Sequence, residues 1–387
     1  MTLFKRLIHD SRTLGVLLLF CTILSLILAN ISGTGIYYSS FWKAEIPGFQ
    51  LLHLPDTVIH FINDALMTLF FFHVAIDIKR EATVGELSTP RRMMLPAVSA
   101  LFGVVFPILI FMLIAGRTIY SGGWAIPTAT DIAFSLGIIS LLGNAVPRSI
   151  KVFLTALAII DDLCAIVIIA LFYGSGLQLQ WLLLVLLLGV IIFFVNRHLH
   201  NRLGSLIMMA LGVVMWYCMF QSGVHASIAG VIIAFLLPAN KMATFETRLN
   251  FPVNFFIIPL FALANTSIVV SAASITGLGS PLSLGIILGL FLGKPIGISL
   301  AVYLMIKLKL AELGKIKWSQ FIGAGILAGI GFTMSIFVSN LAFPQNELYS
   351  DIAKLSVLIA SGLAMTVGFI WLTSFSKGSP SPPVTAP

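Results

Sequence analysis

Charged side chains are scarce in this chain of 387 residues, because Asp, Glu, Lys and Arg together make up only 9% of it. Soluble globular domains carry roughly 25% charged residues and about 45–50% apolar ones, whereas 59% of this chain is hydrophobic. A soluble fold of this length has too little interior to bury that excess. The scarcity of charge therefore excludes a soluble domain and predicts one polytopic unit whose solvent is the lipid bilayer.

Cysteine is equally rare, and several catalytic motifs are missing. Cys21, Cys164 and Cys218 all lie within apolar runs, which leaves no pattern for a disulfide framework or a zinc site. The strings HExxH, GxSxG and GxGD do not occur, which argues against a metalloprotease, a serine hydrolase and an intramembrane aspartyl protease. The net charge of +8 resides in short connectors between apolar runs, so we expect no nucleic-acid partner.

Long apolar runs, by contrast, are abundant. A membrane helix needs about 17–25 residues, and the segments that meet or approach this length are 12–30, 58–78, 94–115, 122–143, 149–173, 179–196, 203–220, 223–238, 252–271, 283–306, 320–343 and 352–375. Of the 22 Lys and Arg residues, all but four lie on the side of the membrane that both termini share. Because cytoplasmic connectors are enriched in Lys and Arg, the sequence predicts twelve transmembrane helices with both termini in the cytoplasm.

A few ionisable residues remain inside the predicted spans, and such residues mark functional sites in membranes. Asp161 and Asp162 stand side by side in ALAIIDDLCAI. Neighbours on a helix point about 100° apart, so the two carboxylates cannot share one narrow partner, although both can border a cavity. A carboxylate there could hold a proton and, after releasing it, offer oxygen ligands to a small alkali ion. A salt bridge with Lys294 that serves only stability would leave one of the two unpaired.

Two spans contain residues that interrupt a helix. In GGWAIPTATDIAFSLG, Pro127 disfavours helical backbone at Ile126, and Thr130 and Asp131 follow closely. The eleventh span contains GAGILAGIGFTMSIF, which is rich in glycine. Non-helical backbone at membrane depth is tolerated only inside protein or beside a water-filled cavity, so both interruptions indicate a transport site.

The interrupted spans are the fourth and the eleventh, and this spacing predicts an inverted repeat in which helices 3–5 correspond to helices 10–12. Half-helices leave partial positive charge at their N-termini and partial negative charge at their C-termini. Asp131 could offset the former and Lys294 the latter. Direct ion contact by Asp131 is an equal alternative, and Lys294 could serve as an ion-pair partner, as a proton carrier, or as both.

These residues together resemble the NhaA-type sodium/proton antiporters of bacterial inner membranes. The matching strings are INDALMTLFFFHVAIDIKRE, GWAIPTATDIAFSLG, ALAIIDDLCAIVIIALFY, SGVHASIAGVI, PLFALANTSI, GKPIGISL and GIGFTMSIF. For this family, inverted repeats and ion sites between half-helices are already established. The resemblance thus implies an all-α polytopic membrane protein in which the two interrupted helices cross at mid-membrane.

The resemblance also implies roles for residues. Asp161 and Asp162 would bind Na⁺ or Li⁺ in exchange for protons, with Asp131, Lys294 and Thr130 beside the helix crossing. It implies an electrogenic, pH-regulated antiporter that needs no cofactor. The candidate pH-regulatory residues are Asp77, Arg80, Glu81, His225, Glu246 and Arg248. Asp64 is a further intramembrane candidate. Asp77 stands where the family commonly has Glu, and Asn250 stands where an acidic residue is expected, so the activation pH stays open.

The expected organisation is a single transporter unit over residues 1–375, with a disordered cytoplasmic tail over 376–387. The long outside connector 31–57 is rich in aromatic residues, which indicates either anchoring at the membrane interface or, as the resemblance implies, contact within a homodimer. A passive channel and a proton-coupled carrier of another cation or a small organic solute are the alternatives to a sodium/proton antiporter.

Overall fold

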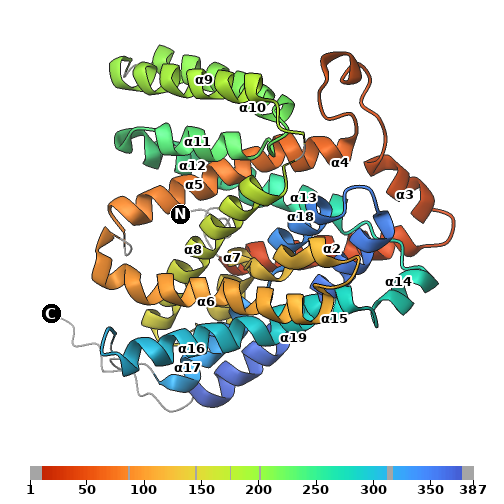
Figure 1. The fold of residues 1–387 in the computed structure, drawn as a ribbon, viewed down its shortest axis with the longest axis vertical. Helices are drawn as coiled ribbons and strands as arrows, with labels where there is room; N and C mark the ends of the chain where they lie inside the picture. The colour runs from red at the N-terminus through yellow and green to blue at the C-terminus, as the bar shows by residue number, and fades with distance from the viewer. Residues whose placement is uncertain are drawn as a thin grey trace.

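The computed structural model describes residues 11–85, 88–143, 146–174, 176–199, 202–311 and 317–376. The predicted tail lies outside these ranges from residue 377 onward, as do Lys5, Arg6 and Lys315 of the charge pattern. Throughout these ranges the chain is helical and forms no β-strand, apart from one isolated bridge between Glu45 and Thr57 (Figure 1).

Ten helical segments of the described chain are long and apolar enough to cross a membrane. Six of them are continuous α-helices: α2 (Ser11–Asn30), α6 (Pro90–Ala115), α8 (Arg148–Phe172), α9 (Leu179–His198), α10 (Arg202–Gln221) and α19 (Glu347–Ser376). The protein is therefore an all-α, multi-pass membrane protein, as its composition predicts.

Two of the predicted spans do not appear among these ten. Helices α17 (Trp318–Ala328) and α18 (Phe332–Ala342) are bent by 43° at their break and make an eleventh span if the pair is counted as one. The predicted span 223–238 contains only α11 (Ile228–Leu236), and nine residues of helix rise about 14 Å, well short of the roughly 30 Å hydrocarbon core. The count of twelve therefore stays a prediction.

Three spans contain one turn of π-helix, which the sequence reading did not anticipate. They are α4 (Val58–Phe61), η2 (Ile62–Leu66) and α5 (Met67–Thr83); α12 (Ala239–Pro252), η6 (Val253–Ile257) and α13 (Ile258–Asn265); and α15 (Pro281–Leu288), η7 (Gly289–Gly293) and α16 (Lys294–Lys307). The first two π-turns contain Asp64 and Asn254, and the third ends directly before Lys294. Single π-turns are frequent at functional sites.

The ninth span begins earlier than predicted. Residues 239–251 were expected to be a connector because they are polar, but they form most of helix α12, which runs on through η6 into α13. Hydropathy marks only the lipid-spanning part of a helix, so a polar extension of the same helix leaves no signal in the apolar pattern.

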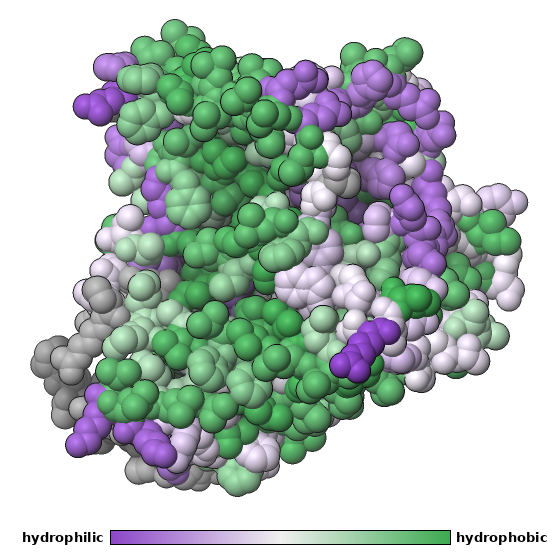
Figure 2. Space-filling view, viewed as in Figure 1, coloured by the Kyte–Doolittle hydropathy of each residue, from purple (hydrophilic) through white to green (hydrophobic). Residues whose placement is uncertain are grey.

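Helix α8, which carries the aspartate pair, packs against α5, α6, α7 and α17 near the middle of the molecule. Helices α9 and α10 lie side by side at one edge (Figure 1). Leucines of α9 are strongly exposed there, with Leu183 at 58% and Leu186 at 67%. Figure 2 shows apolar residues over much of the visible face and hydrophilic ones gathered mainly at its sides, which is the distribution that a lipid solvent requires.

The long connector between α2 and α4 contains α3 (Gly35–Trp42) and the short 3-10 helix η1 (Gln50–Leu52), and α14 (Ala272–Gly277) lies in another connector. In α3, Trp42 is buried while Ile36, Tyr37 and Phe41 are exposed. The connector therefore presents an apolar surface.

Candidate ion-binding site at two interrupted helices

The fourth span is interrupted where the sequence predicts, although a few residues later than Pro127 suggests. The 3-10 helix η4 (Ser121–Thr128) includes Pro127, and α7 (Ile132–Leu141) begins only after Asp131. In the eleventh span, residues 329–331 separate α17 from α18. A Cβ atom at Gly329 would lie 2.5 Å from the carbonyl oxygen of Leu290, so this close approach requires glycine.

The two interruptions contact each other directly. The backbone N–H of Asp131 donates to the carbonyl of Ile330 at 2.6 Å, and Ser335 donates through its hydroxyl to the carbonyl of Ile126 at 2.8 Å. Ser135 likewise donates to Leu327 in the opposite direction. Residues at each break thus form hydrogen bonds with polar backbone groups at the other break. Such bonds are required because no water is present in the hydrocarbon core to replace them. This reciprocity is what an inverted repeat would produce, and the repeat itself stays a prediction.

Asp131 lies where the N-termini of the half-helices α7 and α18 meet. Its Oδ1 accepts a hydrogen bond from the backbone of Phe134 at 3.1 Å, and its Oδ2 accepts from the backbone of Thr333 at 3.0 Å and from the Thr333 hydroxyl. Helix N-termini carry partial positive charge, so one carboxylate compensates two of them. Because both oxygens are already engaged, the geometry favours electrostatic support over direct ion contact.

Asp161 and Lys294 form an ion pair in which both side chains are completely buried. Thr130 completes this group: its hydroxyl oxygen lies 2.5 Å from Asp161 Oδ2 and 2.8 Å from the carbonyl of Ala328, and it accepts a hydrogen bond from Lys294 Nζ at 2.7 Å. A hydroxyl has one hydrogen to donate, so Thr130 serves either Asp161 or Ala328 at any moment. The ion pair is thereby tied to the C-terminal end of α17.

Asp162 has a different environment from its neighbour. It is 3% exposed, and its Oδ1 has no hydrogen-bond partner within the described chain. It borders a cavity of about 260 Å³ whose lining also includes Asp131 and Thr130. The cavity extends toward Asp77, near the end of α5, and toward Asn250. The doublet is therefore split: Asp161 is held by Lys294, and Asp162 faces open space.

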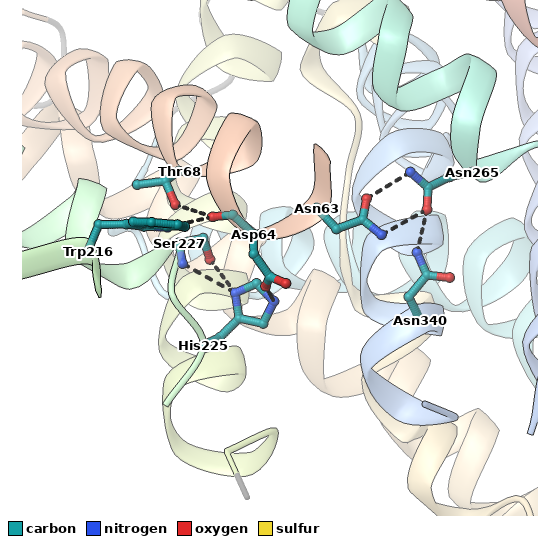
Figure 3. Close-up of polar contacts among 8 residues, drawn as sticks. All are labelled: Asn63, Asp64, Thr68, Trp216, His225, Ser227, Asn265 and Asn340. Atoms are coloured by element: carbon teal, nitrogen blue, oxygen red, sulfur yellow. Dashed lines mark hydrogen bonds and ion pairs between the residues drawn. The ribbon is translucent and has the colours of Figure 1, made fainter. Parts of the chain in front are cut away.

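Asp64 lies in the π-turn η2, which precedes the N-terminus of α5, whereas Asp77 lies near the C-terminal end of α5. Figure 3 shows Asp64 beside His225. His225 Nε2 lies 3.4 Å from Asp64 Oδ1, and its Nδ1 lies 2.8 Å from the Ser227 hydroxyl. The backbone carbonyl of Asp64 accepts hydrogen bonds from the indole of Trp216 at 2.9 Å and from the Thr68 hydroxyl. His225 is thus a buried partner of Asp64 and not a solvated residue at the end of a helix.

The charged residues at the other end of α5 form a partial cluster. Arg80 pairs with Glu246 of α12 and lies 3.3 Å from Glu81. Asp77 lies one turn before Arg80, and its Oδ1 is buried without a hydrogen-bond partner in the described residues. Arg248 is exposed and makes no ion pair within the described ranges. His225 lies apart, since the thirteen residues from Asp64 to Asp77 span roughly 20 Å of helix.

Sequence reasoning missed two groups of polar residues near this site. Thr333 holds Asp131, and the signal for it was available, because it follows the glycine-rich break much as Thr130 accompanies Pro127. The amides of Asn63, Asn265 and Asn340, which meet on the far side of the molecule from the cavity mouth, gave no such signal.

Two interrupted membrane helices that meet beside buried charges define the class of secondary transporters with ion sites between half-helices. The chain belongs to the family Na+/H+ antiporter 1, whose model matches residues 5–372. It is 46% identical to "Na(+)/H(+) antiporter NhaA 2" of Flavobacterium johnsoniae, over 97% of this chain and 93% of that protein. It is 44% identical to "Na(+)/H(+) antiporter NhaA" of Dechloromonas aromatica, over 97% and 96%.

A relative from a third bacterium has a comparable identity. The NhaA antiporter of Proteus mirabilis is 42% identical over 93% of this chain and 94% of its own length. The family is one of transporters and not of enzymes, and Na⁺ and H⁺ are the ions it carries as substrates. The family resemblance and the exclusion of enzyme classes, both drawn from the sequence, are therefore confirmed.

Proposed function

We propose that this protein exchanges cytoplasmic Na⁺ or Li⁺ for external H⁺, with the cation and protons competing for Asp161 and Asp162. One observation carries the proposal: of two adjacent buried carboxylates, only Asp162 faces the cavity, and its Oδ1 has no partner in the described structure. A buried unpaired carboxylate is costly, so it either holds a proton or binds a cation.

The second proton must come from a neighbouring group. Asp161 and Lys294 share one ion pair, and binding of Na⁺ next to Asp162 would add a positive charge beside Lys294. The pair could respond by releasing the Lys294 proton, or Asp161 could itself alternate between a proton and the cation. Either route releases two protons for one Na⁺, and exchange in this ratio moves net charge and makes transport electrogenic.

The position of the cavity supports alternating access. The cavity approaches Asp162 from the end of α5 where Asp77 lies, and the excess of Lys and Arg assigns this end to the cytoplasm. In this proposal, the structure corresponds to a state in which the site is open to the cytoplasm. Exchange requires a second state in which the same carboxylates face outward.

The cluster of Arg80, Glu81 and Glu246 supports a role in pH regulation because it joins α5 to α12 beside the cavity mouth. Asp77 and Asn250 line that mouth and complete the regulatory group that we propose. Arg248 and His225 lie outside it, and a regulatory role for His225 would have to act through Asp64.

The family of the chain supports a proposal about its cellular membrane, and its exposed apolar surface supports one about its oligomeric state. We assign it to the bacterial inner membrane, with both termini in the cytoplasm. A homodimer contact through residues 31–57 is supported by the exposed apolar side chains there, among them Tyr37 at 79% and Leu51 at 87%. No larger assembly is needed for the ion site, which lies within one chain.

The test is direct measurement of proton release. Purified protein in weakly buffered detergent solution is mixed with NaCl or LiCl, and the pH change is followed with a dye; KCl and choline chloride are the ionic controls. We expect Na⁺ and Li⁺ to release protons. Asp162→Asn should abolish the release, and Asp56→Asn, which changes an exposed carboxylate of the connector, should preserve it.

Two outcomes would contradict the proposal. If Na⁺ binds to the unmodified protein without releasing protons at any pH, competition for the same carboxylates is ruled out. If Asp162→Asn still exchanges Na⁺ for H⁺ in vesicles, the cation site lies elsewhere.

A further inference from the structure

The side of the molecule opposite the cavity mouth is closed by packed side chains. Phe71, Phe261 and Phe337 are each 1% exposed, and the ring of Phe337 lies 5.4 Å from that of Phe71 and 6.2 Å from that of Phe261. These rings come from α5, α13 and α18. Any path from the outside to Asp162 that passes between these helices must separate them.

Three asparagine amides join the same three spans farther out (Figure 3). Asn63 and Asn265 form a reciprocal pair, with Nδ2 to Oδ1 distances of 3.2 Å and 2.9 Å in the two directions. Asn340 donates from its Nδ2 to Asn265 Oδ1 at 2.6 Å. Asn63 lies in the π-turn η2, Asn265 ends α13, and Asn340 lies near the end of α18.

The amides are neutral and satisfy one another. Asn265 is 1% exposed, and its Nδ2 also donates to the backbone of Phe261. Neutral amide hydrogen bonds contribute about 0.5–1.5 kcal/mol each, which is small enough to break during a transport cycle. A charged cluster at the same place would cost far more to open. The chemistry therefore suits a contact that is made and broken.

Helix α18 connects this amide group to the ion site. Thr333 at its start holds Asp131, and Asn340 near its end holds Asn265. The separation of seven positions corresponds to about 10 Å of helix and to about two turns, so the two side chains lie on one face. A shift of α18 that follows a change at the crossing of the interrupted helices must also pull on the amides.

We propose that Asn63, Asn265 and Asn340 form an outer latch that closes the external path while the site faces the cytoplasm, and that α18 opens it. This inference rests on the proposed function, because it names the contact that alternating access must break. The competing reading is a static polar network that only stabilises helix packing. The two readings differ in whether the amide contact must separate during exchange.

A cross-linking experiment distinguishes the latch from the static network. In a background with Cys21→Ala, Cys164→Ala and Cys218→Ala, the variant Asn265→Cys/Asn340→Cys is treated with a short bifunctional methanethiosulfonate reagent. We expect Na⁺/H⁺ exchange in vesicles to fall at least about tenfold, whereas Na⁺-induced proton release in detergent stays within about twofold, because only one of the two states is blocked. A monofunctional reagent is the matched control, and reduction should restore exchange.

Each result decides between the readings. Undiminished exchange by the cross-linked protein would overturn the latch, and so would joint loss of exchange and proton release, which would mean that the amides shape the ion site. Failure of the proposed function is distinct, because then the parent with its asparagines intact would release no protons on Na⁺ addition.

A second variant keeps the inference testable if the cysteine pair is inactive before treatment. Asn265→Leu keeps the approximate volume of the side chain and removes all three of its hydrogen bonds with Asn63 and Asn340. We expect the outward-facing state to become more populated, so that a single cysteine introduced at Phe337 reacts several-fold faster with an impermeant thiol reagent added from outside. An unchanged rate would contradict the latch.

Discussion

The ionisable group beside the interrupted helices and the outer asparagine group differ in chemistry and in completeness. At the cavity end, Asp161, Asp162 and Lys294 are ionisable, and Oδ1 of each of the two aspartates lacks a partner in the described structure. At the other end, Asn63, Asn265 and Asn340 are neutral and bonded to one another. An incomplete charged group is poised to bind something from outside the protein, whereas a complete neutral group is suited to holding helices together.

The same contrast exists on a smaller scale within the doublet. Asp161 has an ion-pair partner and Asp162 has none among the described residues, although they are adjacent and almost equally buried. The 100° turn between neighbours on a helix sends one carboxylate to Lys294 and the other to the cavity. The identical side chains therefore have different roles, and stability measurements should distinguish them.

The largest stability effect should come from breaking the ion pair. We expect Asp161→Asn to lower the free energy of unfolding by about 3–5 kcal/mol because Lys294 is left buried without a countercharge. Asp162→Asn should be neutral or stabilising, since it replaces a buried carboxyl group whose Oδ1 has no partner in the described structure. Thermal unfolding in detergent at neutral pH measures both, and equal destabilisation by the two substitutions would remove the distinction between them.

A double substitution sharpens that result. Asp161→Asn/Lys294→Met removes both charges, and we expect it to be more stable than Asp161→Asn alone by about 2 kcal/mol or more, because the members of a buried pair are coupled. Strict additivity of the two single effects would show that the pair seen in the structure contributes little.

The next effect is the pH dependence of Na⁺ binding at the charged group. If one proton competes with Na⁺, the apparent Na⁺ affinity should fall about tenfold for each unit by which the pH falls. If two protons compete, it should fall by up to about a hundredfold for each unit. Isothermal titration calorimetry across pH 6 to 9 checks the slope. Na⁺ affinity that is independent of pH would place protons and the cation at separate sites.

Smaller effects are expected where hydrogen bonds to Asp131 hold the interrupted helices. Thr333→Val removes the hydroxyl that bonds Asp131 but keeps the backbone N–H contact. We expect a loss of about 1–3 kcal/mol in unfolding free energy, as for other hydrogen bonds to charged groups, and weaker exchange. Thr276→Val, which removes an exposed hydroxyl in α14, is the control and should change stability little.

The smallest effect should come from the outer amides. Asn340→Ala removes the neutral hydrogen bond to Asn265 and a longer one, of 3.3 Å, from the Ser350 hydroxyl, and we expect it to cost about 1 kcal/mol, less than Thr333→Val. Thermal unfolding of the two variants side by side makes the comparison. A larger loss for Asn340→Ala would mean that the outer group bears more of the fold's stability than its neutral chemistry suggests.

Prediction from sequence succeeded where the signal was local. The interruption near Pro127 and the glycine-rich break before Phe332 were both placed to within a few residues. It failed at the polar extension that became α12 and at the π-turns, because neither leaves a mark in hydropathy. The short segment 223–238 shows the same limit, since an apolar run of that length does not say whether its helix spans the bilayer.

The sequence alone determined that this protein is a helical membrane transporter, because apolar runs, connector charges and the buried aspartate doublet are properties of single segments. Only the tertiary structure decided which aspartate pairs with Lys294, which one faces the cavity, and that three distant asparagines meet. Those outcomes depend on how helices far apart in the chain rotate and pack against one another, and no single segment carries that information.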